Sequence, residues 1–223
     1  MQESMFTMLL TLPLFQGLSY DDVTRIIEST RLDFSTLTEG TILCRQDDSC
    51  TDLYIILEGR LKSHTTSADR SWAVEEEISE RSIVGLNVLY GRRRTYPSTV
   101  TALTTTRVLR IDKRTMGALF RYFEVMQINA FNVLTSEIAS RERVLWLPPA
   151  ITLEQRITRF MQFHVSRPAG HKRFEISMAL LGLYLGEDQR RISKALHNMS
   201  NEGLIELQRR AVVVPAFEKL LSR

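Results

Sequence analysis

The sequence predicts an α+β protein: a jelly-roll barrel of short β-strands, then one long helix, then a winged helix-turn-helix. Short runs rich in Leu, Ile, Val and Tyr recur between about residues 32 and 111, with glycines at the turns. A helical apolar pattern occupies 124–145, and two helical patterns that meet at a glycine follow Pro148 and Pro149. The expected parts are therefore 1–123, 124–147 and 148–223.

Composition places the chain among globular proteins. It has 223 residues, of which 43% are hydrophobic and 25% charged, enough for one large or two small domains. The longest apolar runs are too short to cross a bilayer, and no basic region followed by an apolar stretch opens the chain. We therefore expect no membrane partner and a cytoplasmic location.

Charge is distributed unevenly along the chain. Residues 1–151 have a net charge of −2, and residues 152–223 have a net charge of +5. A basic C-terminal third favours a polyanion as the partner of that third.

The chain has two cysteines, Cys44 and Cys50. Two thiols cannot supply an iron–sulfur cluster or a four-thiolate zinc site, so we expect no such cluster and no metal site. They are interpreted as reduced thiols, and a redox pair is the less favoured alternative.

Six segments of the N-terminal part have strand character. Glycines mark the expected corners at Gly40, Gly59, Gly85 and Gly91. The expected strands are Thr41–Cys44, Leu53–Leu57, Arg60–His64, Trp72–Ile78, Thr99–Ala102 and Arg107–Ile111.

The long helix carries an apolar stripe made by Phe131, Leu134, Ile138 and Leu145. Their spacings of 3, 4 and 7 resemble a heptad seam, which favours a parallel homodimer. The alternative is a helix that packs this stripe on its own barrel.

In the C-terminal third, Ser177 is the expected cap of the first helix, and Gly182 and Gly186 allow a close helix crossing and a tight turn. The second helix begins at Gln189. On its exposed face Arg190 and Lys194 suit guanine edges or phosphates, Gln189 suits adenine, and Ser193 suits either. The full set of expected DNA contacts is Ser177, Gln189, Arg190, Arg191, Ser193, Lys194, His197 and, in a wing turn, Arg209 and Arg210.

Two regions resemble known domains. The Leu53–Leu61 hairpin with its Gly59, the Leu14–Ser19 lead-in, Thr38–Leu43 and Arg107–Ile111 resemble cyclic-nucleotide-binding domains. Ile176–Ile205 is similar, without a gap, to the helix-turn-helix of the Crp/Fnr family of bacterial transcriptional regulators. The resemblance implies a homodimer that binds an inverted repeat in double-stranded DNA, responds to an effector in its barrel and contacts RNA polymerase.

The resemblance also places an effector pocket at Gly85, Leu86, Asn87, Tyr96, Pro97 and Ser98. In cyclic-nucleotide-binding relatives a glutamate and an arginine hold the ribose and the phosphate; here Leu86 and Tyr96-Pro97 stand in their places. Tyr96 could donate only one neutral hydrogen bond to such a ligand. We therefore expect an unknown small-molecule effector other than cyclic AMP. Arginines 92–94 could replace the lost cation, although a solvated loop is favoured.

The sequence leaves a haem-based sensor and a regulatory subunit that does not bind DNA as alternatives. Some relatives sense nitric oxide or redox state through haem, for which His64 would be a candidate axial ligand. A regulatory subunit that does not bind DNA is another class, but it would not need a helix-turn-helix. Nothing in the sequence matches a phosphate loop, a nucleophile elbow or zinc-ligand spacing, so an enzyme is not expected.

Overall fold

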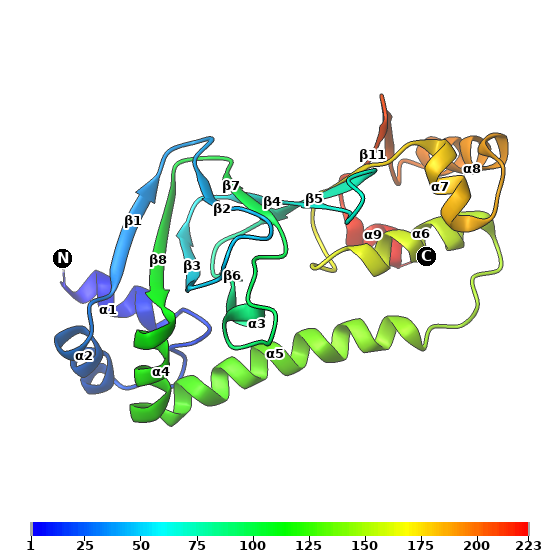
Figure 1. The fold of residues 1–223 in the computed structure, drawn as a ribbon. Coiled ribbons are helices and arrows are strands. Elements are labelled where there is room, and N and C mark those ends of the chain that lie inside the picture. The colour runs from blue at the N-terminus through cyan, green and yellow to red at the C-terminus, as the bar shows by residue number, and fades with distance from the viewer. Residues whose placement is uncertain (1, 223) are drawn as a thin grey trace. The chain divides into compact units, whose positions relative to one another are not determined.

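The computed structural model describes residues 2–222, and side-chain burial from residue 5. It divides the chain into two compact units. The N-terminal unit comprises the residues up to Leu61 together with Ile78–Ser140, and the C-terminal unit comprises Lys62–Glu77 together with the residues from Arg141 on. The expected α+β class is confirmed (Figure 1). The part boundaries expected at 123/124 and 147/148 stay a prediction.

The N-terminal unit is built on strands that lie far apart in sequence. One antiparallel sheet has the order β1-β8-β3-β6, and β2 pairs with β7. The strands are β1 (Asp33–Leu37), β2 (Ile42–Cys44), β3 (Asp52–Glu58), β6 (Ile83–Val84), β7 (Thr99–Ala102) and β8 (Thr106–Asp112). The helices are α1 (Gln2–Leu10), α2 (Tyr20–Ser29), α3 (Leu86–Leu89), α4 (Lys113–Tyr122) and α5 (Glu124–Leu145).

Strands β3 and β8 contribute much of the core of this unit, and β3 is buried along most of its length. Leu53, Ile55, Val108 and Ile111 are at most 1% exposed on the paired strands β3 and β8. Gly59 has a φ of 91°, and an added Cβ would lie 2.6 Å from the Thr105 carbonyl oxygen. This turn therefore requires glycine.

Helix α5 begins on the N-terminal unit and is anchored to it by Asn129. The Asn129 side-chain amide donates to the carbonyl oxygens of Leu14 and Gln16, at 3.2 and 2.7 Å. Met126 and Ala130 are buried against the same core. These contacts occupy one face of α5 and leave the adjacent face outside the core.

The C-terminal unit contains a hairpin from the middle of the sequence. Strands β4 (Leu61–Thr66) and β5 (Ala73–Ile78) form it, and β5 pairs with β9 (Lys172–Glu175) over four residue pairs, from Ala73↔Glu175 to Glu76↔Lys172. The sheet continues through β11 (Ala211–Val214) to β10 (Glu206–Gln208). The helices of this unit are α6 (Leu153–His164), α7 (Met178–Leu185), α8 (Gln189–Asn201) and α9 (Phe217–Leu221).

The hairpin contributes to the C-terminal core. Val74 is buried in the cluster that includes Phe160, Phe174 and Leu196. Trp72 packs beside it, and its indole nitrogen donates to the Tyr184 hydroxyl at 3.1 Å. The hairpin is thus an integral part of this unit.

Candidate nucleic-acid interface and barrel interior

Local sequence determines how α8 begins. Gly186 ends α7 in the left-handed conformation with φ 64°, and the Asp188 side chain accepts hydrogen bonds from the backbone nitrogens of Arg190 and Arg191 at 2.8 and 3.0 Å. This cap satisfies backbone donors that the first turn leaves unpaired, and its negative charge suits the helix N-terminus.

A close approach and a buried core set the angle between α7 and α8. A Cβ added to Gly182 would lie 2.5 Å from the Glu187 carbonyl oxygen, so a larger residue would force the turn outward. Leu181, Ile192 and Leu196 are at most 1% exposed and lock the two helices together. The predicted role of Gly182 at a close crossing is confirmed.

The core-forming residues leave the first turns of α8 exposed on the opposite face. Gln189, Arg190 and Lys194 are exposed, and Ser193 is half-buried beside them. Among the described residues, no hydrogen bond or ion pair engages the side chains of Arg190 and Lys194. Both cations are therefore available to an external partner.

Other expected contact residues have internal partners. The Arg191 guanidinium lies 2.5 Å from a Glu187 carboxylate oxygen, and Arg156 holds the other oxygen of Glu187 at 2.7 Å. The Ser177 hydroxyl accepts from the Leu180 nitrogen at 3.1 Å. His197 Nδ1 lies 2.7 Å from the Ser193 carbonyl oxygen. Their expected part in DNA contact stays a prediction.

The expected wing is a tight hairpin between β10 and β11. Gln208 pairs with Ala211, and Arg210 adopts a positive φ of 59° at the turn. Arg209 and Arg210 are both exposed at its tip. Such a turn presents two cations without burying either.

A buried ion pair ties the hairpin to the C-terminal unit. Glu76 is 3% exposed and Lys172 is fully buried, and the Lys172 Nζ lies 3.4 Å from a Glu76 carboxylate oxygen. Glu76 also accepts from the backbone nitrogens of Ser166 and Arg167 at 2.9 Å each, and Lys172 donates to the Ala169 carbonyl oxygen at 2.7 Å. Burial lowers the pKa of Lys172, although the Glu76 charge opposes this shift.

The expected effector pocket is partly filled by its own side chains. Leu86 and Tyr96 are buried, at 6% and 4% exposure, and the Tyr96 hydroxyl donates to the Asp52 carbonyl oxygen at 2.7 Å. The hydrogen bond that Tyr96 could offer to a ligand is therefore used inside the protein. A Cβ on Gly85 would lie 2.9 Å from the same Asp52 oxygen, so this corner is close-packed.

The other expected pocket residues do not converge there. Asn87 and Pro97 are exposed, and Ser98 is half-buried. Arginines 92–94 are all exposed. They do not replace the missing cation in this conformation.

Both cysteines are buried free thiols. Burial raises the pKa of Cys44 to about 12, and burial also raises the pKa of Cys50 above its usual value. Both groups are therefore poor thiolate nucleophiles at neutral pH.

His64 does not belong to the barrel core. It is half-buried on β4 within the C-terminal unit, and its Nε2 lies 3.5 Å from a Glu175 carboxylate oxygen. This environment is charged, unlike the apolar surroundings of a buried haem.

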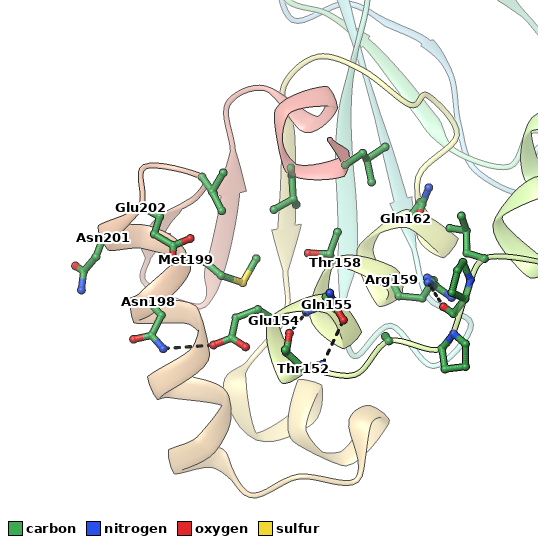
Figure 2. A pocket seen from close by; sticks show the side chains of 17 residues that line it. Thr152, Glu154, Gln155, Thr158, Arg159, Gln162, Asn198, Met199, Asn201 and Glu202 are labelled. Atoms are coloured by element: carbon green, nitrogen blue, oxygen red, sulfur yellow. Dashed lines mark hydrogen bonds between the residues drawn. The ribbon is translucent and has the colours of Figure 1, made fainter. Parts of the chain in front are cut away.

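A pocket of about 760 Å³ that the sequence did not indicate lies between α6, α8 and the segment 147–150. Figure 2 shows Glu154 and Asn198 directed toward one another across it, joined by a 3.3 Å hydrogen bond. The guanidinium of Arg159 donates to the Pro148 carbonyl oxygen at 2.8 Å. The pocket arises from packing of separate helices, so no local motif marks it.

The apolar stripe of α5 is largely uncovered within the chain. Phe131, Ile138 and Leu145 are 56%, 63% and 65% exposed, and Ile128 adds a further exposed apolar side chain. Leu134 differs, because it is half-buried against the N-terminal core. The N-terminal core therefore covers one edge of the expected stripe and leaves the rest of it exposed.

A protein-family model and a bacterial regulatory protein both match this chain. The family model for the cyclic nucleotide-binding domain matches residues 34–122. The anaerobic regulatory protein of Haemophilus influenzae is 22% identical over 208 residues, which are 91% of this chain and 79% of that protein. The chain therefore contains a cyclic nucleotide-binding domain and is similar over most of its length to a bacterial regulatory protein, and it is called the regulator below. These matches agree with the resemblance to Crp/Fnr regulators that the sequence predicts, and DNA binding is what that resemblance implies.

The regulator is also similar to solved structures. The Thermus thermophilus catabolite activator protein has 18% identity and a TM-score of 0.49 over 94% of the regulator and 96% of that chain. The sensor domain of the transcriptional regulator DNR from Pseudomonas aeruginosa has 18% identity and a TM-score of 0.49 over 61% of the regulator and 95% of that chain. Within residues 2–222, no helix is long and apolar enough to span a membrane.

Proposed function

We propose that the regulator binds an inverted-repeat operator as a homodimer, under the control of a signal other than cyclic AMP sensed by its barrel. The observation that carries the proposal is the exposed N-terminal face of α8, where Arg190 and Lys194 have no internal partner among the described residues. Cations with free donors at this end of a helix suit guanine edges in the major groove.

The wing supplies a second kind of contact. Arg209 and Arg210 sit on a turn between paired strands and can reach phosphates. Phosphate contacts fix the register of the protein on the duplex and carry no base information. RNA polymerase is the further protein partner that the family resemblance implies.

The exposed side chains of α5 favour the dimer. A second copy of the helix would cover Phe131, Ile138 and Leu145, which water otherwise contacts. Two copies related by a two-fold axis place two α8 helices on one side of a duplex, about one helical turn apart.

Substituting the base-reading residues tests the proposed contacts. Arg190→Ala with Lys194→Ala should weaken binding to the specific site by roughly 1–3 kcal/mol for each bidentate interaction with guanine that is removed. Arg209→Ala should weaken all sequences about equally. Fluorescence anisotropy at fixed salt, with operator and scrambled duplexes, measures both effects. An unchanged ratio of operator to scrambled affinity in the double variant would contradict the assignment.

Cyclic AMP is expected not to act as the effector. Its phosphate would enter a region where Leu86 and Tyr96 are buried and arginines 92–94 are exposed to solvent. An unpaired buried charge costs several kcal/mol, and each missing hydrogen-bond partner costs roughly 1–3 kcal/mol. Calorimetric titration should show no binding at micromolar concentrations. Low-micromolar binding with a matching gain in operator affinity would show that the arginine loop closes over the ligand.

Haem is the less favoured signal. The candidate ligand His64 lies beside Glu175 rather than among apolar side chains, so the residues do not fit that cofactor. A non-nucleotide effector remains the favoured alternative, because the buried Leu86, Tyr96 and Cys50 offer no charged partner for a nucleotide.

A further inference from the structure

Three side chains able to bind a metal ion meet at the edge between the β4–β5 hairpin and β9. They are His64 of β4, Glu75 of β5 and Glu175 of β9, each half-buried. Their nearest ligand atoms all lie within 4.8 Å of one another. The three strands are neighbours in one sheet of the C-terminal unit, so the backbone holds the side chains in place.

The distance between His64 and Glu175 suits two ligands of one ion. His64 Nε2 lies 3.5 Å from Glu175 Oε2, longer than the usual hydrogen bond of about 2.9 Å. Two ligand atoms that each lie about 2.0–2.1 Å from a tetrahedral zinc ion are separated by about 3.3 Å. A small movement of either side chain reaches that separation.

Each of the two carboxylates also forms an ion pair with a neighbouring cationic side chain. Lys62 Nζ lies 2.6 Å from Glu75 Oε1, and Arg173 Nε lies 3.1 Å from Glu175 Oε1. These contacts use one oxygen of each carboxylate and leave the other oxygen for a further ligand. Outer hydrogen bonds of this kind orient ligands around protein metal sites.

Glu175 lies between the Arg173 guanidinium and the His64 imidazole. Burial acts to raise its pKa, but the hydrogen bonds from Arg173 and His64 outweigh this effect, and the pKa lies below its usual value.

We propose that His64, Glu75 and Glu175 form a binding site for a divalent transition-metal ion, with Zn²⁺ as the probe. One imidazole and two carboxylates leave a fourth position for water. Lys62 and Arg173 each pair with one of the two carboxylates, so the group of side chains is close to neutral before the ion binds. The ion would join the hairpin to β9 and stabilise the C-terminal unit. This proposal does not depend on the proposed operator binding.

Zinc titration of the full-length, chelator-treated protein tests the site. Calorimetry and native mass spectrometry should show one equivalent bound, with a rise in melting temperature. His64→Ala and Glu175→Gln should each lower the affinity about 100-fold or more, since each removes a direct ligand. His171→Ala is the matched control, because this exposed histidine lies just before β9, and it should bind zinc as the unaltered protein does.

A spectroscopic measurement keeps the test decisive if a variant fails to fold. Co²⁺ bound by one imidazole and two carboxylates should give visible absorption in the unaltered protein, and excess Zn²⁺ should abolish it. Absence of this absorption, or equal zinc affinity in the unaltered protein and His64→Ala, would overturn the proposal.

Discussion

Replacing Phe131 and Ile138 together with aspartate is expected to convert the regulator from a dimer into monomers. The two side chains are 56% and 63% exposed and lie seven residues apart on α5. In a two-fold seam each substitution would bring like charges together in an apolar contact, which costs several kcal/mol. A monomer engages one half-site, so operator affinity should fall by about 10²–10⁴-fold because avidity is lost.

Sedimentation at micromolar concentration measures this first effect. Asn132→Asp with Ser136→Asp is the matched control, since it adds the same charge at exposed positions of α5 away from the stripe. The control should remain dimeric and bind its operator normally. A Phe131→Asp/Ile138→Asp protein that still sediments as a dimer would show that another surface joins the subunits.

Glu76→Gln is expected to be the most destabilising conservative change in the C-terminal unit. The substitution leaves the fully buried Lys172 ammonium without its counter-charge, and a single amide oxygen must serve the Ser166 and Arg167 nitrogens. Removing one partner of a buried ion pair costs about 3–5 kcal/mol. The free energy of unfolding from urea denaturation should fall by that amount.

The adjacent residue gives a matched control for this second effect. Glu75 pairs with Lys62 at 2.6 Å, but both side chains are partly exposed, at 20% and 37%. Glu75→Gln, measured with a chelator present, should therefore cost at most about 1 kcal/mol. Equal losses for the two variants would mean that the Glu76–Lys172 pair does not anchor the hairpin.

Local signals predict much of the fold. Ser19 is a typical helix cap, and its hydroxyl accepts from the Asp22 nitrogen at 3.1 Å at the start of α2. Alternation and capping likewise predict most strand segments and the two helices that meet at Gly186. These features depend on residues that are neighbours in sequence.

Long-range pairing accounts for the features that sequence patterns do not predict. No local pattern indicates β9, because this strand is defined by its pairing with β5 and β11. Glu76 lies within a run of three glutamates, a pattern typical of a solvent-exposed strand. The ion pair with Lys172, which is distant in sequence, offsets the cost of burying the Glu76 carboxylate. The internal hydrogen bond of Tyr96 likewise depends on a carbonyl 44 residues away.

Two copies of the regulator are expected to read a two-fold symmetric site through α8. Selection of bound duplexes from a random-sequence pool, followed by sequencing and native mass spectrometry of the complex, tests this expectation most directly. We predict an inverted repeat with half-site centres about 10–10.5 base pairs apart and two chains on each duplex. Enrichment of no sequence, or of a single half-site bound by one chain, would contradict it.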